Sequence, residues 1–543
     1  MSAASTPLAS ADGRGQRPAA VRLIALLMLF LLGACAGLPP RPDLPQTQAL
    51  ADPASTPLGR LVAQASPGPR VSGFRTLIAG DDALDARLAL ADHARRTLDL
   101  QYYAISKDVS AHVVLERLHA AADRGVRVRL LLDDLNTAGA DDALLALINR
   151  PNVEVRLYNP FPIGRGSTLT RVLGSLADFS RINRRMHNKL FVADNAIAIT
   201  GGRNLGDPYF VRSDTSNFVD LDLLVAGPAA RTLSRSFDRF WNGPLAYPAA
   251  MFVTDAPPPH LHMRDDSLPL DAPPAQAEAA EAAAAAQAAA TAPPPGALSR
   301  QLAANRLPLV WAPARVLADR PSKLDHDEEP APQETLFDDI GALLRSAQRE
   351  VILVSPYFVP GAHGMALLRE LRARGVAVRV LTSSLAATDA PVVHIGYARY
   401  REDLLRLGVS LHELRPEVGH TEVRLGRFGS SASKLHAKAF VVDRQRVLIG
   451  SMNFDPRSNR LNTEVGVLVF SPVIAGEIAA MYQSISEEAA WRLSLHEGGG
   501  LRWTANAAAD GVAPAEASEE PGASLWLRIA LRLLTPLAPE EML

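Results

Sequence analysis

One short motif occurs twice in this chain and constrains its fold more than any other feature. The copies begin at His187 and His436, and both obey the pattern H-x-K-x4-D-x6-G-[GS]-x-N. Their first residues are 249 positions apart. A chance match to H-x-K-x4-D alone is expected on the order of 0.01 times in a chain of this composition. The repeat therefore indicates a duplicated domain that keeps one set of reactive side chains in each copy.

The segments around the motif repeat with nearly the same period. A predicted helix ends at Gly125 and is followed by the apolar run 126–132, and a second one ends at Gly375 before the run 376–381. Alternating helices and strands predict an α/β fold with a largely parallel or mixed sheet in each copy. A period of this length is typical of a duplicated domain and not of a solenoid. One hydrophobic core rarely grows beyond roughly 250–300 residues, which also favours two domains.

Composition shifts along the chain predict six parts. We expect a lipoprotein signal peptide over 1–34, a tether over 35–70, a first domain over 71–256, an Ala/Pro-rich linker over 257–300, a second domain over 301–495 and a tail over 496–543. The linker has good helix formers but no apolar face, which favours a solvated connection. The tail contains an amphipathic segment around Trp526, with Arg528 and Arg532 on one face. Such a helix suits a membrane interface, and it equally suits a cap on the domain core.

The N-terminus has the layout of an exported lipoprotein. Arginines precede the apolar run 23–32, which is shorter than the roughly 20 residues of a spanning helix. The run leads to Cys35, the single cysteine of the chain, in a Leu-Gly-Ala-Cys sequence that resembles a bacterial lipobox. This resemblance implies a lipid anchor on Cys35 in the cell envelope, facing the periplasm. Ala36 in the next position favours the outer over the inner membrane, and an ordinary signal peptide is the alternative.

Charge and cysteine content exclude several classes of function. The 56 basic and 58 acidic residues leave a net charge of -2, so no broad basic surface for nucleic acid is expected. One cysteine excludes a disulfide framework and a cysteine-based zinc site. The chain has only five lysines, and two of them stand in the motif. Since arginine carries nearly all the other positive charge, the two motif lysines are candidate functional residues.

The motif residues suit the transfer of a phosphodiester group. This chemistry needs a nucleophile, an acid for the leaving oxygen and fixed positive charge on the phosphoryl oxygens. One histidine can attack phosphorus while the other protonates the leaving alcohol, and the lysines supply charge without a metal or another cofactor. Asn204 and Asn453 can also bind phosphoryl oxygens, and Ser451 adds a donor. His187 and Lys189 alternate in a strand-like segment, so we expect them on the same face.

A carboxylate is expected to orient each histidine, as in a catalytic triad. Asp220 and Glu464 follow the two motifs at matching places. Aligning the two segments pairs Asp220 with Glu464, and Asp222 with Gly466. We therefore expect Asp220, and not Asp222, to be the orienting residue of the first copy. A solvated charge at a strand edge is the alternative for both acids.

The duplicated motif resembles the hallmark of the phospholipase D superfamily, and the likeness covers roughly residues 75–490. It implies two tandem phospholipase D-like α/β-sandwich domains related by a pseudo-twofold axis, with one shared active site. It implies a catalytic set from both motifs: His187, Lys189, Asp194, His436, Lys438 and Asp443. The usual nucleophile of relatives maps to His187 and the general acid to His436, although the reverse assignment stays open. Gly202 stands where the family usually has serine, so the first motif lacks that hydroxyl.

Further stretches resemble the cardiolipin synthase C family, notably 201–210, 218–227, 355–361 and the tail. That likeness implies transfer of a phosphatidyl group to phosphatidylglycerol, with phosphatidylethanolamine as the donor, through a phosphohistidine intermediate. Phospholipids and the membrane surface are then the expected partners, without nucleic acid or metal. Tyr357 is expected to line the substrate entrance, and a core aromatic is the alternative.

Two other functions compete with this interpretation. A phospholipase D-type hydrolase would use the same chemistry with water as the acceptor. A catalytically silent envelope-binding lipoprotein is the weaker alternative, because both motifs keep every reactive side chain. An accessory protein and the oligomeric state are left open by the sequence.

Overall fold

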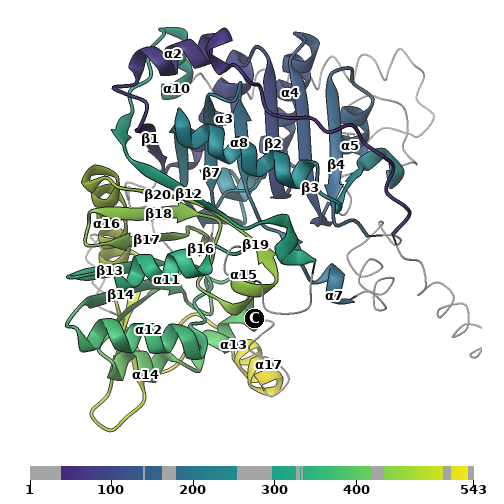
Figure 1. The fold of residues 1–543 in the computed structure, drawn as a ribbon. Helices are drawn as coiled ribbons and strands as arrows, with labels where there is room; N and C mark the ends of the chain where they lie inside the picture. The colour runs from purple at the N-terminus through teal and green to yellow at the C-terminus, as the bar shows by residue number, and fades with distance from the viewer. Residues whose placement is uncertain are drawn as a thin grey trace, which may run out of the picture.

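The computed structural model describes residues 38–137, 141–161, 179–253, 296–325, 331, 334–416, 432–505 and 515–535. Cys35 and nearly all of the predicted linker lie outside these ranges. The described chain forms two halves, each built on one mixed β-sheet (Figure 1). In Figure 1 the first half, purple to teal, lies above the second half, which runs from green to yellow.

The first half contains a nine-stranded sheet of order β10-β4-β3-β2-β6-β7-β9-β1-β11. Its strands are β1 (Ser72–Leu77), β2 (Thr97–Ala104), β3 (Arg127–Asn136), β4 (Val153–Tyr158), β6 (Leu190–Ala193), β7 (Ile197–Gly201), β9 (Asp222–Ala226), β10 (Ala246–Pro248) and β11 (Val310–Ala312). Strands β2, β3 and β4 are parallel, and the other neighbours are antiparallel. The strands at the centre are apolar nearly throughout because helices cover both faces of the sheet.

The second half repeats this arrangement in a ten-stranded sheet of order β12-β20-β18-β17-β13-β14-β15-β21-β22-β23. Its strands are β12 (Ala314–Ala318), β13 (Glu350–Val354), β14 (Ala377–Ser383), β15 (Ser410–Leu414), β17 (Ala439–Val442), β18 (Arg446–Gly450), β20 (Val465–Val469), β21 (Ala490–Leu495), β22 (Leu501–Ala505) and β23 (Ala515–Ala517). Here β13, β14 and β15 are the parallel strands. Except for β11, β22 and β23, the two sheets match strand for strand, which confirms the predicted tandem α/β domains.

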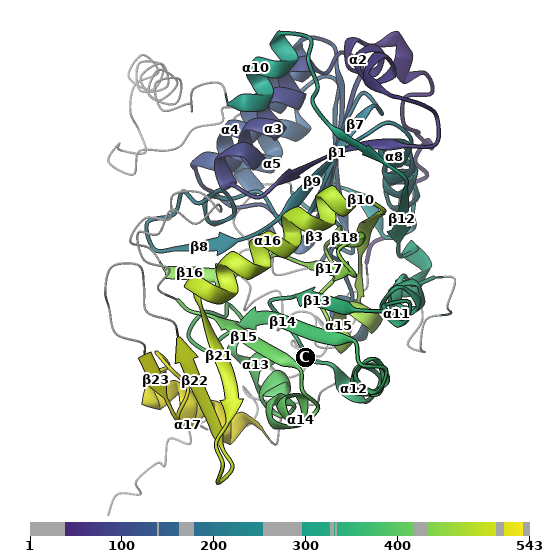
Figure 2. The ribbon, with the colours of Figure 1, turned by 90° about the vertical axis from the view of Figure 1, so that its left-hand side faces the viewer.

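Helices form three layers around the two sheets. Helices α3 (Gly80–His93), α4 (Val109–Asp123) and α5 (Asp141–Ile148) cover the outer face of the first sheet, and α11 (Phe337–Arg345) and α12 (Gly361–Ala373) cover that of the second. Helices α8 (Pro228–Trp241) and α16 (Pro472–Glu488) belong to a core that also includes strand residues of both halves. Figure 2 shows α16 running between the two sheets. The halves therefore share a continuous hydrophobic core, which fixes their relative position.

Several short elements complete the described chain. They are η1 (Pro53–Ser55), α2 (Pro57–Ala65), α7 (Phe179–Ile182), β5 (Arg185–Met186), η3 (Asp207–Phe210), β8 (Ser216–Val219), η4 (Ala249–Met251), α10 (Ala297–Ala303), η5 (Pro321–Leu324), α13 (Pro391–Ala398), α14 (Arg401–Arg406), β16 (Ala432–Leu435), α15 (Pro456–Arg460), β19 (Asn462–Thr463) and α17 (Leu525–Leu534). Among the described helices, none combines the length and the apolar content that a membrane crossing requires.

The boundary expected at residue 301 differs from the structure. Helix α10 packs against α3, where the Asp85 carboxylate accepts hydrogen bonds from the backbone N–H groups of Gly296 and Leu298, each at 2.9 Å. Strand β11 then pairs with β1 at the edge of the first sheet. Residues 301–312 therefore complete the first half, because α10 and β11 bind to α3 and β1 of that half.

The expected tether and tail also begin differently. Within the predicted tether, Arg41 Nε donates to Ala246 O at 2.9 Å, Ala49 N donates to Asp238 Oδ2 at 2.8 Å, and α2 contributes to the core of the first half. The described part of the tether is therefore packed on the first half. At the other end, β22 and β23 extend the second sheet past the expected boundary at 495.

Candidate active site

Each motif histidine lies in a short extended segment that is held by backbone of the other half. His187 and Lys189 lie between β5 and β6, and His436 and Lys438 lie between β16 and β17, so they directly precede the strands in which they were expected. Strand β5 pairs with β19 of the second half, and β16 pairs with β8 of the first half. His187 N donates to Thr463 O at 3.0 Å, and His436 N donates to a first-half carbonyl at 2.8 Å. Both motifs therefore meet at the junction of the halves.

The predicted carboxylates orient the histidines in a crossed manner. His187 Nδ1 lies 3.0 Å from both carboxylate oxygens of Glu464, which comes from the second half. His436 Nδ1 lies 2.7 Å from Asp220 Oδ2, which comes from the first half. In both histidines Nε2 is left for chemistry when Nδ1 donates its proton to the carboxylate. All four side chains are buried, so one site is assembled from both halves.

Asp222, the rejected alternative in the first copy, has a supporting position. Its carboxylate lies 3.0 Å from Arg87 Nη2 and 3.5 Å from Arg203 Nη1, in a buried ion-pair cluster. Arg203 also donates to the backbone carbonyl of Asp220 at 2.8 Å. The cluster therefore holds the segment that presents Asp220 to the histidine of the other half.

Glu464 is held by different groups. Ser451 Oγ donates to Glu464 Oε2 at 2.5 Å, so this hydroxyl supports the carboxylate and not a phosphoryl oxygen as expected. Asp319 Oδ2 accepts a hydrogen bond from Glu464 N at 2.9 Å and forms a buried ion pair with Lys323 Nζ at 2.7 Å. Lys323, one more of the five lysines, thus lies directly behind the site.

Gly202 is explained by its contact with Asp220. A Cβ atom placed on Gly202 would lie 2.0 Å from Asp220 Oδ1, which is far inside the contact distance of carbon and oxygen. The serine of the second motif, Ser451, has room because it donates to Glu464 from the side. The two copies therefore differ at this position because they hold their carboxylates differently.

The motif lysines are buried and supply positive charge to the site. Lys189 Nζ donates to His187 O at 2.7 Å, and Lys438 Nζ donates to His436 O at 2.5 Å. Burial lowers the pKa of Lys189 to about 7, and it also lowers the pKa of Lys438. Each ammonium has three protons, so donors remain for phosphoryl oxygens. In the part of the chain that the structure describes, no group of His, Cys, Asp or Glu side chains is arranged to hold a metal ion.

The two histidines differ in their electrostatic surroundings. Burial, together with the charges of Lys189 and Lys438, holds the pKa of His187 well below its usual value. Burial also lowers the pKa of His436, but Asp220 opposes this shift. Burial alone would raise the pKa of Asp220, yet the charge of His436 and its hydrogen bond bring it down to about 2.

Glu464 has the opposite shift. Burial raises the pKa of Glu464 to about 7, and the nearby lysine charges only partly offset the effect. The carboxylate beside His187 is therefore a weak stabiliser of positive charge, whereas Asp220 beside His436 is firmly ionised. The surroundings thus favour the neutral form of His187, and they stabilise the protonated form of His436 more than that of His187.

The structure does not bring the motif aspartates, Asp194 and Asp443, to the histidines. Asp194 follows the far end of β6 and accepts hydrogen bonds from three successive backbone N–H groups, those of residues 95–97. Asp443 follows β17 and binds the N–H groups of residues 348–350 in the same way. Both residues have left-handed backbone with φ of 51° and 54°. Their expected catalytic role is corrected to that of an anchor between neighbouring strands.

The two motif asparagines differ in their contacts. Asn204 Oδ1 accepts from Ala104 N at 3.2 Å, and its Nδ2 donates to the Tyr209 hydroxyl at 2.9 Å. Asn453 has a buried amide oxygen without a hydrogen-bond partner in the described structure. An amide oxygen accepts hydrogen bonds and does not bind a phosphoryl oxygen, so the expected contact of the asparagines with substrate stays a prediction.

Aromatic side chains surround the histidines, and the sequence analysis did not identify them. The Tyr103 ring packs edge-on against His187 with centroids 4.9 Å apart, and Tyr209 packs against His436 at 5.3 Å. Phe218 also contacts His436, with centroids 5.1 Å apart. The motif spacing carries no signal for these residues because each lies on a different loop or strand. Tyr209 and Phe218 lie in the stretches 201–210 and 218–227, which were the available hint, whereas Tyr103 lies in neither.

Tyr357 has a hydrogen-bond partner that was not predicted, and its place at the substrate entrance stays a prediction. Its hydroxyl donates to Asp389 Oδ1 at 2.9 Å. Burial raises the pKa of Tyr357, and the charge of Asp389 raises it further, as do Tyr209 and Tyr103. Tyr357 is therefore close to Tyr209 and Tyr103, two of the three aromatic residues that contact the histidines.

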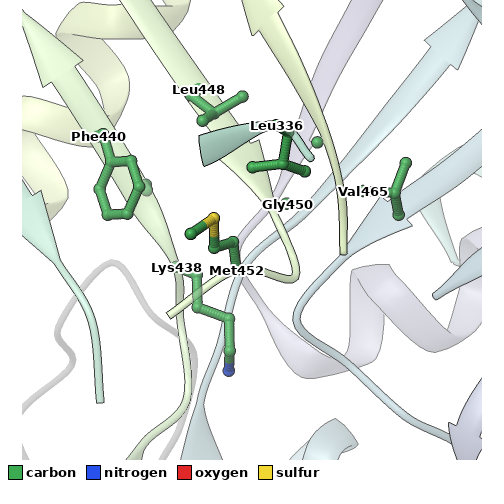
Figure 3. A pocket seen from close by; sticks show the side chains of 9 residues that line it. Leu336, Lys438, Phe440, Leu448, Gly450, Met452 and Val465 are labelled. Carbon is green, nitrogen blue, oxygen red and sulfur yellow. The ribbon is translucent and has the colours of Figure 1, made fainter. Parts of the chain in front are cut away.

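A small apolar pocket lies behind Lys438 and is separate from the reactive groups. Figure 3 shows it between Leu336, Phe440, Leu448 and Val465, with the Lys438 ammonium pointing away from these side chains. Its walls are core residues of the second half. It therefore represents imperfect packing below the lysine and not the substrate site.

Comparisons with known proteins identify the family of this chain. The family described as cardiolipin synthase with a phospholipase D-like domain matches residues 88–241 and 340–486, one segment in each half. Cardiolipin synthase C of Escherichia coli K12 is 40% identical over 469 residues, which cover 85% of this chain and 94% of that relative. An uncharacterized protein of Helicobacter pylori is 33% identical over 479 residues, covering 87% of this chain and 91% of its own length.

A solved structure shares the fold. The phosphatidylserine synthase of Haemophilus influenzae Rd KW20 superposes with a TM-score of 0.56 at 13% sequence identity. The match covers 87% of this chain and 95% of that protein. At such low identity the likeness concerns the tandem fold alone.

Proposed function

The chain belongs to the cardiolipin synthase family of the phospholipase D superfamily and is a phosphatidyltransferase, and on this basis we propose that it makes cardiolipin from phosphatidylglycerol and a second phospholipid. The observation that carries the proposal is the crossed pairing of His187 with Glu464 and of His436 with Asp220 in one buried site. Two oriented histidines beside two lysines fit a two-step transfer of a phosphoryl-linked group.

The first step forms a covalent intermediate. While its Nδ1–H donates a hydrogen bond to Glu464, His187 attacks the phosphorus of the donor lipid through the lone pair on Nε2. A phosphorus–nitrogen bond forms, and the bond between phosphorus and the headgroup oxygen breaks. His436 gives its proton to the leaving alkoxide, and Lys189 and Lys438 bind the charged phosphoryl oxygens.

The second step reverses these roles. A hydroxyl group of phosphatidylglycerol gives its proton to His436, and its oxygen attacks phosphorus. The phosphorus–nitrogen bond breaks, and its electron pair returns to His187. The product has two phosphatidyl groups joined through one glycerol, and the enzyme regains its starting protonation.

The surroundings of the histidines support this assignment of roles. A nucleophile must be neutral, and the lowered pKa of His187 provides that state. A general acid must carry a proton. Burial lowers the pKa of His436, but the ionised Asp220 opposes this shift, so His436 keeps its proton more readily than His187 does. The electrostatic difference between two otherwise similar halves thus favours His187 as the nucleophile.

A lipid with a good leaving group tests the roles directly. With a phosphatidyl p-nitrophenyl ester, the first step no longer needs an acid. The His436→Ala variant should then release at most one nitrophenol per enzyme and stall, and the His187→Ala variant should release none. A burst in the His187→Ala variant, with none in the other, would reverse the assignment.

The nature of the acceptor is tested with labelled phospholipid, with and without phosphatidylglycerol. The wild-type enzyme should form labelled cardiolipin only when phosphatidylglycerol is present. Phosphatidic acid as the sole product under both conditions would replace the synthase by a hydrolase that uses water. Product formation that persists in the double histidine variant would exclude the site itself.

We also propose that Cys35 is lipidated and anchors the enzyme to the outer membrane, facing the periplasm. The support is the lipobox-like sequence around the single cysteine. Fractionated cell envelopes should contain the wild-type protein in the outer-membrane fraction, and a Cys35→Ser variant should lose that association. Recovery of both proteins in the inner membrane would contradict the proposal.

A further inference from the structure

Helix α17 presents an apolar face to solvent. Nine large hydrophobic side chains of the described residues are exposed, and five of them belong to this ten-residue helix. Trp526 is 80% exposed, Leu533 72% and Leu525 60%. The outward side of a surface helix is ordinarily polar, so such a concentration indicates an interaction surface.

The helix is held firmly by its inner side. Leu531 is only 8% exposed and packs with Leu385 and Ile395. Ser524 caps the first turn by accepting from Leu527 N at 3.2 Å, and Arg399 donates to Thr535 O at 2.9 Å after the last turn. The helix therefore does not cap the core with its apolar face, which was the alternative open from the sequence. That face points outward in the described structure.

Helix α17 is linked through α13 to the expected substrate entrance. It packs against α13, which begins two residues after Asp389, the partner of the Tyr357 hydroxyl. Val392 at the start of α13 is 45% exposed, so a further exposed apolar side chain lies on the helix that follows Asp389. A surface bound to α17 would therefore be close in the fold to the expected entrance.

We propose that the face formed by Leu525, Trp526, Ile529, Leu533 and Leu534 docks on the surface of a phospholipid bilayer. The helix carries Arg528, which pairs with Glu519 outside the helix, and Arg532, and it has no acidic residue of its own, which suits a membrane that contains anionic lipid. A tryptophan beside aliphatic residues and arginines is the composition of helices that lie at the headgroup boundary. Docking brings the site entrance to its lipid substrates, and only this consequence depends on the proposed function.

A flotation experiment with vesicles tests the docking. The full chain with Cys35→Ser, which has no acyl anchor, should bind vesicles of phosphatidylcholine with phosphatidylglycerol more tightly than pure phosphatidylcholine vesicles. Adding Trp526→Ser and Leu533→Ser should weaken the binding at least about ten-fold. The matched control changes two exposed apolar residues elsewhere, Phe470→Ser and Val473→Ser, and should bind as before.

Activity on a short-chain phospholipid, dissolved below its micellar concentration, separates docking from catalysis. The Trp526/Leu533 variant should retain activity on this substrate within about two-fold and lose most of its activity on vesicles. Equal vesicle binding by all variants would overturn the docking proposal. Absence of activity on both substrates in every form, with vesicle binding intact, would refute the proposed function and leave docking standing. A concentration-dependent dimer that only the Trp526/Leu533 variant loses would assign the face to a second copy instead.

An independent observation concerns the carboxylate at the entrance. Asp389 is exposed, and one of its oxygens is held by Tyr357 at 2.9 Å. The segment of Tyr357 is tied to the second motif, because Ser355 Oγ accepts from Phe454 N at 3.0 Å directly after Asn453, so Asp389 lies on the side of that motif. In keeping with this position, its charge raises the pKa of His436 and of Lys438. A carboxylate repels the phosphoryl group, so this acceptor suits a hydroxyl group of the substrate and not its phosphate.

We infer that Asp389, positioned by Tyr357, accepts a hydrogen bond from a hydroxyl of the glycerol headgroup and thereby favours that acceptor over water. The incoming alcohol must give its proton to His436, so its headgroup lies on the side where Asp389 stands. A glycerol headgroup has a second hydroxyl that can reach the carboxylate, whereas water has no second group. This inference rests on the proposed two-step transfer.

The Asp389→Ala and Tyr357→Phe variants test the inference with soluble acceptors. The nitrophenol burst measures the first step in each variant, so transfer and hydrolysis are both expressed relative to it. The ratio of transfer to glycerol over hydrolysis should fall about ten-fold in Asp389→Ala, while transfer to propan-1-ol changes little. Asp403→Ala, at an exposed carboxylate on α14, is the matched control.

Two outcomes would overturn this role. An unchanged ratio of glycerol transfer to hydrolysis would show that Asp389 does not select the acceptor. A selective slowing of the first step with an amine-bearing donor headgroup would show that the carboxylate binds an ammonium group instead. If the burst is absent even in the wild-type enzyme, the proposed function fails before the acceptor is tested.

Discussion

At the scale of single residues, the repeated motif combines residues that serve the reactive site with a residue that stabilises the fold. Lys189 reaches the reactive site, whereas Asp194, five residues later, binds three backbone N–H groups at the other end of the strand. The spacing between them follows from the length of β6, which separates the site from the turn. A motif can thus be kept because it builds the strand as much as because it reacts.

Because Asp194 and Lys189 have different roles, a substitution of Asp194 should mainly lower stability and a substitution of Lys189 should mainly lower activity. Asp194→Asn should lower the free energy of unfolding by roughly 2–4 kcal/mol, because buried backbone donors lose a charged acceptor. The folded fraction should keep kcat within about three-fold. Lys189→Ala should lower kcat at least about 100-fold, because it removes charge from the phosphoryl site. Denaturant unfolding and kcat per folded enzyme check both, and a 100-fold loss of kcat in folded Asp194→Asn would contradict the anchoring role.

The pKa of Lys189 predicts proton uptake on anion binding. Burial lowers this pKa to about 7, so the free amine increasingly loses its charge above pH 7. A phosphate ion favours the charged amine, so binding should take up protons between about pH 7 and 9, and affinity should fall as pH rises. Calorimetric titration with inorganic phosphate at pH 8, in buffers of different ionisation enthalpy, measures the uptake.

The matched control for this titration is Lys189→Arg, because arginine stays charged throughout the range. The variant should bind phosphate with less proton uptake than the wild type at pH 8. Equal uptake in both proteins would assign the proton to another group.

Gly202 gives a residue-scale prediction on the asymmetry between the motifs. Gly202→Ser would introduce a Cβ that meets Asp220 Oδ1, so the carboxylate should shift away from His436. We expect a loss of kcat of about ten-fold or more with small change in secondary structure. The reciprocal Ser451→Gly should cost less, because Glu464 keeps its contact with His187. Circular dichroism and steady-state kinetics provide the comparison, and full activity of Gly202→Ser would show that Asp220 can be held elsewhere.

At the scale of secondary-structure elements, four short strands connect the halves. Strands β5 and β19 pair over two residues, and β8 and β16 pair over four. Each pair lies directly beside a motif histidine or an orienting carboxylate. The joints are small, but they determine which histidine meets which carboxylate.

The long strands and the reactive residues were predictable from sequence, but the pairing of β5 with β19 and of β8 with β16 was not. Apolar runs such as 126–132 mark central strands because both faces of the sheet are covered. A two-residue strand has no periodicity, and its partner lies more than 240 residues away, so no local pattern indicates the pairing. For the same reason Asp220 and Glu464 were identified by alignment of the copies, whereas their crossing was not. The aromatic residues around the histidines were missed because packing in three dimensions, and not spacing, brings them together.

At the scale of the whole molecule, α10 and β11 bind the first half from beyond the linker. The structure therefore predicts that a cut introduced within residues 254–295 leaves the two fragments together. The second fragment begins with the helix capped by Asp85 and the strand paired with β1, and both halves share one core. The cut enzyme should elute as one species and retain at least about half of its activity. Gel filtration after cleavage at an inserted protease site tests this, and separation of the fragments without denaturant would contradict it.

The crossed histidine–carboxylate pairs have a consequence for how this protein behaves on dilution. Two separate chains of half the length would associate at a rate set by their concentration. Their shared site would come apart when that concentration fell. Joining the halves in one polypeptide gives each half a fixed effective concentration of the other, on the order of millimolar for a flexible linker. The two histidines and their carboxylates therefore stay together however dilute the enzyme becomes.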